Sequence, residues 1–170
     1  FGTTGYSALG GGASIGSTSR TQAFGAWSLQ VNHTVTSEGG FYNAGTPAAG
    51  SYSATVFVRG TVSHRYRLLA TEAAGGASLG AGSVTATGGW DTLSFPFGMP
   101  SGTGLLVEYR HQDAANGTFY LDGVQLESGT SNTTYIDGDQ PGGTWTGAQH
   151  ASTTIRTSQY RGGGSVIALS

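Results

Sequence analysis

Arginine residues and one aromatic residue recur at alternate positions of three β-prone runs, where they could recognise a sugar. The runs cover residues 54–59, 65–70 and 105–110. Because successive side chains of a strand point to opposite faces, one face of each run is mostly apolar and the other mostly polar. The candidate contact residues on the polar faces are Phe57, Arg59, Arg65, Arg67, Glu108 and Arg110.

These residue types suit carbohydrate recognition. An aromatic ring stacks on the apolar face of a pyranose, while guanidinium and carboxylate groups hydrogen-bond to hydroxyls. If the three runs share one sheet face, the six side chains form a glycan-binding surface. The same pattern also fits a solvated sheet surface or a seam against a neighbouring subunit, and the sequence leaves these alternatives open.

Metal-binding patterns are sparse. Asp137 and Asp139 flank a glycine and offer the hard oxygen donors that Ca²⁺ prefers. Asp-Gly is also a common turn dipeptide, and the pattern favours a turn over an ion site. The four histidines are far apart in the sequence and lack the spacing of zinc ligands, so we expect each of them in a loop or on a strand surface: His33, His64, His111 and His150.

Catalytic patterns are weak as well, and we predict that the chain is not an enzyme. The string G-x-S-x-G occurs around Ser14 and Ser78, but a nucleophile elbow needs a following helix and neither stretch predicts one. Glycoside hydrolysis needs two carboxylates in one cleft. The candidates are typical of solvated or turn-capping groups: Glu108, Asp113, Asp122 and Glu127.

The composition excludes several classes of protein. Glycine supplies 31 of 170 residues and only 9% are charged, which argues against a helical bundle, and the net charge of −2 gives no electrostatic footprint for nucleic acid or an anionic membrane. The absence of cysteine excludes disulfides and thiolate metal sites. No apolar run is long enough for membrane insertion. Without an initiator Met or a signal peptide, the chain is expected to be a piece of a longer protein or a processed one.

Short β-prone runs separated by Gly, Ser and Thr predict an all-β sandwich or barrel. We expect one hairpin between 52–59 and 64–71, and another between 105–110 and 119–127 across the Asn116-Gly117 turn signal. Further strands are expected at 27–31, 83–87 and 90–95. From Ser128 onward the sequence is loop-like, and residues 165–169 are expected to form a last strand or to lead into a downstream segment.

Three segments, 50–60, 89–94 and 117–127, resemble jelly-roll carbohydrate-binding modules with a galactose-binding-like β-sandwich. The most specific element is the strand with Phe119, Tyr120, Asp122, Val124 and the Leu126-Glu127 pair, and the resemblance covers about residues 1–128. It implies an antiparallel jelly-roll β-sandwich that binds a glycan without catalysis. It also implies a structural Ca²⁺ ion with Asp122 as a ligand.

The segment 134–152 is similar to one found in minor tail proteins of phages that infect actinobacteria, where it follows such a sandwich. This similarity implies an extracellular virion component at the phage tail, acting as a homo-oligomer beside other tail subunits. It would engage host cell-wall polysaccharide during adsorption. The alternative is a structural decoration or spacer domain that mediates subunit contacts in the tail.

The remaining residues, 129–170, are predicted to form an irregular C-terminal extension. It is expected to pack on the sandwich, with Tyr135, Ile136 and Trp145 as anchors, or to link to a downstream domain. Burying such side chains contributes on the order of 1.5–3 kcal/mol each, which suffices to hold a loop-rich segment.

Overall fold

The computed structural model describes residues 5–74, 76–113, 116–133 and 135, together with the backbone of three short strands at 143–145, 154–156 and 166–168. Every regular element in this part of the chain is a β-strand. No helix among these residues is long and apolar enough to cross a membrane. The predicted all-β, antiparallel jelly-roll sandwich is confirmed.

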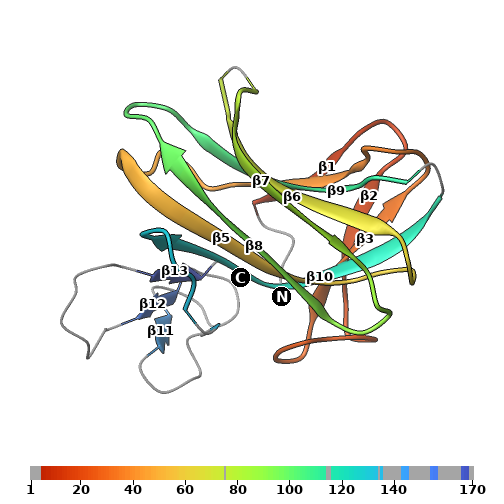
Figure 1. Cartoon of the computed structure of the whole chain (residues 1–170). Coiled ribbons are helices and arrows are strands. Elements are labelled where there is room, and N and C mark those ends of the chain that lie inside the picture. Colours follow the sequence, from red (N-terminus) through yellow and green to blue (C-terminus); the bar gives the residue numbers. More distant parts are fainter. Residues whose placement is uncertain are drawn as a thin grey trace.

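Two antiparallel sheets face each other (Figure 1). The first, sheet A, has the strand order β1 (Tyr6–Leu9), β4 (Gly39–Asn43), β9 (Leu105–His111), β6 (Arg65–Glu72), β7 (Ser78–Thr85). The second, sheet B, is built on β2 (Ser14–Thr18), β3 (Ser28–His33), β10 (Gly117–Ser128), β5 (Gly50–Arg59), β8 (Asp91–Met99).

The long strand β10 organises sheet B. Its first half pairs with β3 and its second half pairs, on the same side, with β13 (Val166–Ala168), while β5 follows its other edge. The strand predicted within 165–169 is therefore confirmed. Beyond β13 lie β12 (Thr154–Arg156) and β11 (Gly143–Trp145), so the extension adds strands to sheet B.

A bulge interrupts β10 between Asp122 and Gln125, where the register to β5 shifts. Gly123 has φ +56°, in the left-handed region that glycine adopts without steric cost. Because of the extra residue, Leu121 and Val124 both face the core although they are three positions apart. The bulge thereby keeps Asp122 and Gln125 on the opposite face.

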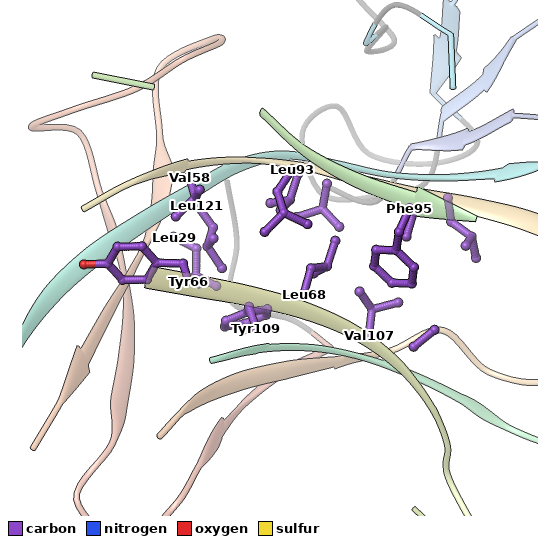
Figure 2. Close-up of a cluster of buried hydrophobic side chains, with 14 of the residues drawn as sticks. Leu29, Val58, Tyr66, Leu68, Leu93, Phe95, Val107, Tyr109 and Leu121 are labelled. Atoms are coloured by element: carbon purple, nitrogen blue, oxygen red, sulfur yellow. The ribbon is translucent and has the colours of Figure 1, made fainter. Parts of the chain in front are cut away.

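The core fills the space between the sheets with alternate residues of their strands (Figure 2). Val56 and Val58 of β5 meet Leu68 of β6 and Val107 of β9, each about 1% exposed. This is the inward-facing set that period-2 alternation predicts for these runs. Full burial of each such side chain contributes roughly 1.5–3 kcal/mol.

Both predicted hairpins are wrong, although their strands exist. β5 belongs to sheet B and β6 to sheet A, so residues 60–64 cross from one layer to the other. Likewise, β9 pairs with β4 and β6, whereas β10 pairs with β3 and β5. Packed sheets lie about 10 Å apart, a span that four or five extended residues cover, so a short link does not by itself indicate a hairpin.

Strand β4 was not predicted because it begins with two glycines instead of apolar residues. These glycines allow close packing of β9. A Cβ on Gly39 would lie 1.8 Å from the carbonyl oxygen of Tyr109, and one on Gly40 would lie 2.6 Å from its ring. The pairing of β4 with β9 therefore requires glycine at both positions.

Gly39→Ala is expected to destabilise the fold by about 1–3 kcal/mol, because β4 must move away from β9 to make room for the methyl group. Gly16→Ala in β2 is the matched control, since no atom lies within 4 Å of a Cβ at that position. Urea unfolding of both variants measures the difference. Equal midpoints for the two variants would contradict this account of β4.

Glu38, which is buried, joins two turns at one end of the sandwich. Its Oε2 accepts hydrogen bonds from the backbone N–H of Thr34 at 2.6 Å and of Val35 at 3.1 Å, and its Oε1 accepts one from the N–H of Gly12 at 2.7 Å. These bonds, that of Thr34 above all, lower the pKa of Glu38 from 4.5 to about 2. The ionised carboxylate is therefore the form that the fold favours.

The stability that Glu38 contributes to the fold should depend on pH. Because its pKa is depressed in the folded state, the contribution is fully present above pH 4.5 and is lost as the pH falls towards 2. We expect Glu38→Gln to lower the melting temperature near neutral pH and to reduce its decline between pH 4.5 and 2. Thermal unfolding across this range measures both effects, and a parallel decline in both proteins would contradict the assignment.

Candidate functional site

The six predicted contact residues do not share one face. Phe57 and Arg59 point outward from β5 in sheet B, whereas the other four lie on the outer face of sheet A: Arg65, Arg67, Glu108 and Arg110. The predicted alternation within each strand is correct. The assumption of a common surface is wrong, because β5 and β6 cross between the layers instead of pairing.

The outer face of sheet B is covered by the segment between β2 and β3. Asp122 Oδ2 accepts hydrogen bonds from the backbone N–H of Ala23 at 2.8 Å and of Phe24 at 2.9 Å. The Phe24 ring then packs on Phe57, with centroids 4.7 Å apart, and on Tyr135, with centroids 4.4 Å apart. Phe57 is thus part of an aromatic cluster instead of a free stacking surface.

The chain that follows β10 covers another part of the same face. Glu127 is buried and accepts hydrogen bonds from the N–H of Thr133 at 2.9 Å and from its hydroxyl at 2.6 Å. Ser53 Oγ donates to the carbonyl of Ser131 at 3.3 Å. Arg59 is engaged too, because its guanidinium donates to Thr21 Oγ1 at 2.8 Å.

The outer face of sheet A presents two parallel rows of cross-strand neighbours. Reading from β4 to β7, the strand register places Phe41, Glu108, Leu69 and Ala81 in one row. The adjacent row is Gly39, Arg110, Arg67 and Ser83. An apolar strip interrupted by one carboxylate therefore runs beside a strip of guanidinium groups.

Glu108 is buried and fixed by its neighbours. Its Oε1 accepts a hydrogen bond from Thr71 Oγ1 at 2.7 Å, and its Oε2 pairs with Arg110, whose Nε lies 2.8 Å away and whose Nη2 is also in contact. The Arg110 side chain remains one-third exposed. This pair orients Arg110 and leaves part of its guanidinium accessible to a ligand.

A pocket of about 300 Å³ opens on this face beside the arginines. It is lined by Arg65, Arg67, Ala81, Gly82, Ser83 and Gln112, with no carboxylate among them. Arg65 Nη2 donates to Ser83 Oγ at 3.2 Å. Alternation within β6 predicts both arginines on this face, whereas the positions of Phe41, Ser83 and Gln112 depend on strand pairing and were not predicted.

The four candidate catalytic carboxylates do not assemble into one cleft. Glu108 lies on the outer face of sheet A, whereas Asp122 and Glu127 lie on the outer face of sheet B, on the other side of the sandwich. Asp113 accepts the backbone N–H of Arg65 at 2.6 Å. Ser14 and Ser78 each begin a strand, without a helix after them, as predicted.

The predicted Ca²⁺ ligands fall into two groups. Both carboxylate oxygens of Asp122 face N–H donors, because Gly123 N–H bonds to Oδ1 at 2.8 Å while Oδ2 holds the 23–24 segment. Three N–H donors already occupy most of the acceptor positions of this carboxylate, so this arrangement does not fit an ion. Burial raises the pKa of Asp122 above its usual value, and the hydrogen bonds from its three N–H partners offset only part of this rise. Asp137 and Asp139 lie outside the described residues, and Ca²⁺ binding there stays a prediction.

Three of the four histidines meet at one end of the core, although their spacing in the sequence does not indicate it. His111 and His33 are buried, with ring centroids 3.9 Å apart, and His64 Nδ1 lies 3.0 Å from His111 Nε2. Burial, together with the neighbouring histidines, lowers the pKa of His111 to about 4. The expected positions on strand surfaces are wrong for His33 and His111, and His150 lies outside the described residues.

Solved structures identify the fold. The chain matches a CBM22-1 xylan-binding domain from Paenibacillus barcinonensis Xyn10C at 20% identity and a TM-score of 0.60, covering 74% of this chain and 86% of that domain. The chain shares the β-sandwich fold of this module. A family 22 module of Clostridium thermocellum Xyn10B also matches, at 20% identity and a TM-score of 0.59, with coverage of 76% and 89%.

A third match is TmCBM61 in complex with β-1,4-galactotriose, at 16% identity and a TM-score of 0.52, covering 74% of this chain and 92% of that one. No family model and no curated protein matches the chain. At these levels of sequence identity, the similarity to solved structures establishes the fold alone. The choice between the two outer faces as a binding surface must come from the residues of this chain.

Proposed function

We propose that this module binds an acidic polysaccharide, without catalysis, on the outer face of sheet A. The observation that carries the proposal is the pocket of about 300 Å³ lined by Arg65, Arg67, Ser83 and Gln112 without a carboxylate. Two guanidinium groups supply forked donors for a carboxylate or phosphate, and the hydroxyl and the amide can bond to sugar hydroxyls.

The adjacent row of residues, which begins at Phe41, favours a sugar over a free anion as the ligand. Phe41 and Ala81, at the two ends of a row whose middle residues Glu108 and Leu69 are buried, provide apolar surface on which a pyranose can rest. Arg110 extends the line of donors beyond the pocket. The opposite outer face is a poorer candidate, because Phe57 packs on Phe24 and Arg59 bonds to Thr21. The matched structures are carbohydrate-binding modules, which is consistent with a glycan as ligand.

A role in a phage tail is the biological setting that we propose. It rests on the similarity of residues 134–152 to minor tail proteins of phages that infect actinobacteria. In that setting the module is an extracellular part of the virion that binds the host cell wall beside other tail subunits. Repeated copies in a homo-oligomer would compensate for weak single sites, because linked sites raise the effective concentration. The spacer domain remains the alternative.

Titration calorimetry with acidic and neutral polysaccharides tests the proposal. We expect binding of glycans that carry carboxylate or phosphate groups, with an affinity that falls as salt is added, because the attraction to arginine is screened. Neutral glycans of similar length should bind more weakly. Absence of binding to acidic glycans by both the single module and an engineered oligomer would contradict the proposal and favour the spacer role.

A further inference from the structure

We propose that His64, His111 and Asp113 form a binding site for a divalent transition metal, with Zn²⁺ as the best fit. The three residues lie at the end of the sandwich where β6 begins and β9 ends, close to the links that cross between the sheets. The observations that support this metal site do not rest on the proposed glycan-binding face.

The ligand atoms lie at distances that suit a shared ion. His64 Nδ1 is 3.0 Å from His111 Nε2, and His111 Nε2 is 3.7 Å from Asp113 Oδ2. All three atoms lie within 4.8 Å of one another. Bonds of about 2.0–2.1 Å in a tetrahedral site separate neighbouring ligand atoms by about 3.3 Å. Small side-chain rotations therefore bring all three atoms to one Zn²⁺ ion.

Two imidazole nitrogens that face each other at 3.0 Å would repel if both presented a lone pair, so a hydrogen atom or a cation must lie between them. A single hydrogen serves, with one ring as donor and the other as acceptor. A cation serves equally, and it lets both neutral rings use their lone pairs while Asp113 supplies a negative charge. Among the described residues, no hydrogen-bond partner faces His111 Nδ1, so this side of the ring does not hold Nε2 to one protonation state.

The surroundings hold the three ligands in place. Asp113 Oδ2 accepts the N–H of Arg65 at 2.6 Å, and the backbone of His64 bonds to Thr61 and Ala86. The His111 ring is stacked on His33 at 3.9 Å, and its backbone N–H bonds to the Glu38 carbonyl at 3.0 Å. Such supporting contacts pre-orient ligands and reduce the entropy that binding must overcome.

The site combines a closed side with an open one. The His111 side chain is fully buried, whereas that of Asp113 is 40% exposed. An ion can enter from the Asp113 side and keep a water molecule as its fourth ligand. Two nitrogens and one carboxylate oxygen suit Zn²⁺, Ni²⁺ or Cu²⁺, whereas Ca²⁺ and Mg²⁺ prefer sites made of oxygen atoms alone.

Metal binding would tie the link before β6 to the residues after β9. It would also restrain Arg65, which follows His64 in the chain and whose N–H bonds to Asp113. Because Arg65 lines the pocket on sheet A, a bound ion would fix one wall of the proposed glycan site. The site is thus expected to stabilise the fold whether or not the glycan proposal holds.

The test uses the full chain without a histidine tag, stripped of metal with a chelator. Calorimetric titration with Zn²⁺ should show one equivalent bound, and Co²⁺ should give the visible absorption of a four-coordinate ion. His64→Ala and Asp113→Asn should each weaken Zn²⁺ binding by at least about 10-fold. Asp91→Asn is the matched control, because Asp91 is also a carboxylate that holds a turn, through Thr87.

Two outcomes overturn the proposal. One is a wild-type protein that binds no Zn²⁺ and shows no rise in melting temperature with it. The other is binding that His64→Ala and Asp113→Asn leave unchanged, which would place the ion elsewhere in the chain. His64 and Asp113 are on the accessible side of the site, so His64→Ala and Asp113→Asn are expected to fold. Circular dichroism checks that they do. His111 is left intact because it is part of the core.

Discussion

Replacing Arg65 and Arg67 together by alanine will weaken binding of an acidic polysaccharide by roughly 100-fold. Each guanidinium lines the pocket and can make charge-assisted hydrogen bonds, which contribute about 1.5–3 kcal/mol each when desolvated. Partial exposure reduces this value, and about 1.4 kcal/mol per arginine corresponds to a tenfold loss of affinity for each. Calorimetry with the best acidic ligand measures the change.

Arg59→Ala is the matched control for this loss. Arg59 is an arginine on the outer face of the opposite sheet, bonded to Thr21, and its removal changes the net charge by the same amount as one of the two substitutions. We expect its affinity to equal that of the wild type. The affinity of Arg67→Lys should lie between that of the wild type and that of Arg67→Ala, because lysine keeps the charge and loses the planar fork of the guanidinium. Equal losses from Arg59→Ala and Arg67→Ala would contradict the choice of face.

Asp122→Ala will destabilise the protein by about 2–4 kcal/mol. Its buried carboxylate accepts hydrogen bonds from three backbone N–H groups, those of Ala23, Phe24 and Gly123, and the substitution leaves all three without this partner. Phe24 also loses the contact that holds it over Phe57. Urea denaturation measures the free energy of unfolding. The solvent exposure of the aromatic cluster, which contains Phe24, Phe57 and Tyr135, can be followed separately.

Asp91→Ala serves as the comparison for Asp122→Ala. Asp91 also accepts a backbone N–H, from Thr87, but these bonds are exposed, and its removal should cost at most about 1 kcal/mol. Asp122→Asn keeps the size of the side chain and should recover only part of the stability, because an amide has one acceptor oxygen. A loss of stability for Asp122→Ala no larger than for Asp91→Ala would contradict its role in holding the 23–24 segment.

The strands and their inward faces were predictable because they depend on local alternation. In β5 the sequence places Val56 and Val58 on one side and Phe57 and Arg59 on the other, and the structure agrees. Which strands are neighbours depends on contacts between distant residues. The short link after Arg59 fits a hairpin or a crossing between layers equally well, so the sequence could not place Arg59 and Arg65 on opposite sides of the sandwich.

The candidate sites illustrate the same limit. Arg65 and Arg67 were found because they alternate within one strand, whereas Phe41 was missed because the glycines before it hide β4. The cluster of His33, His64 and His111 could not be found from spacing, because its members come from three strands or links that are far apart in the chain. The pairing of Tyr66 with His111 in sheet A brings the neighbouring His64 to His111, and the packing of sheet B on sheet A stacks His33 on the His111 ring.

The most direct measurement is a map of backbone amide chemical shifts in labelled protein during titration with an acidic oligosaccharide. The account predicts that the changes cluster on β6, β7 and β9, around Arg67, Ser83 and Arg110, and that they vanish in the Arg65→Ala/Arg67→Ala variant. Changes confined to β5 and β10 around Phe57 and Arg59, with sheet A unaffected, would contradict it.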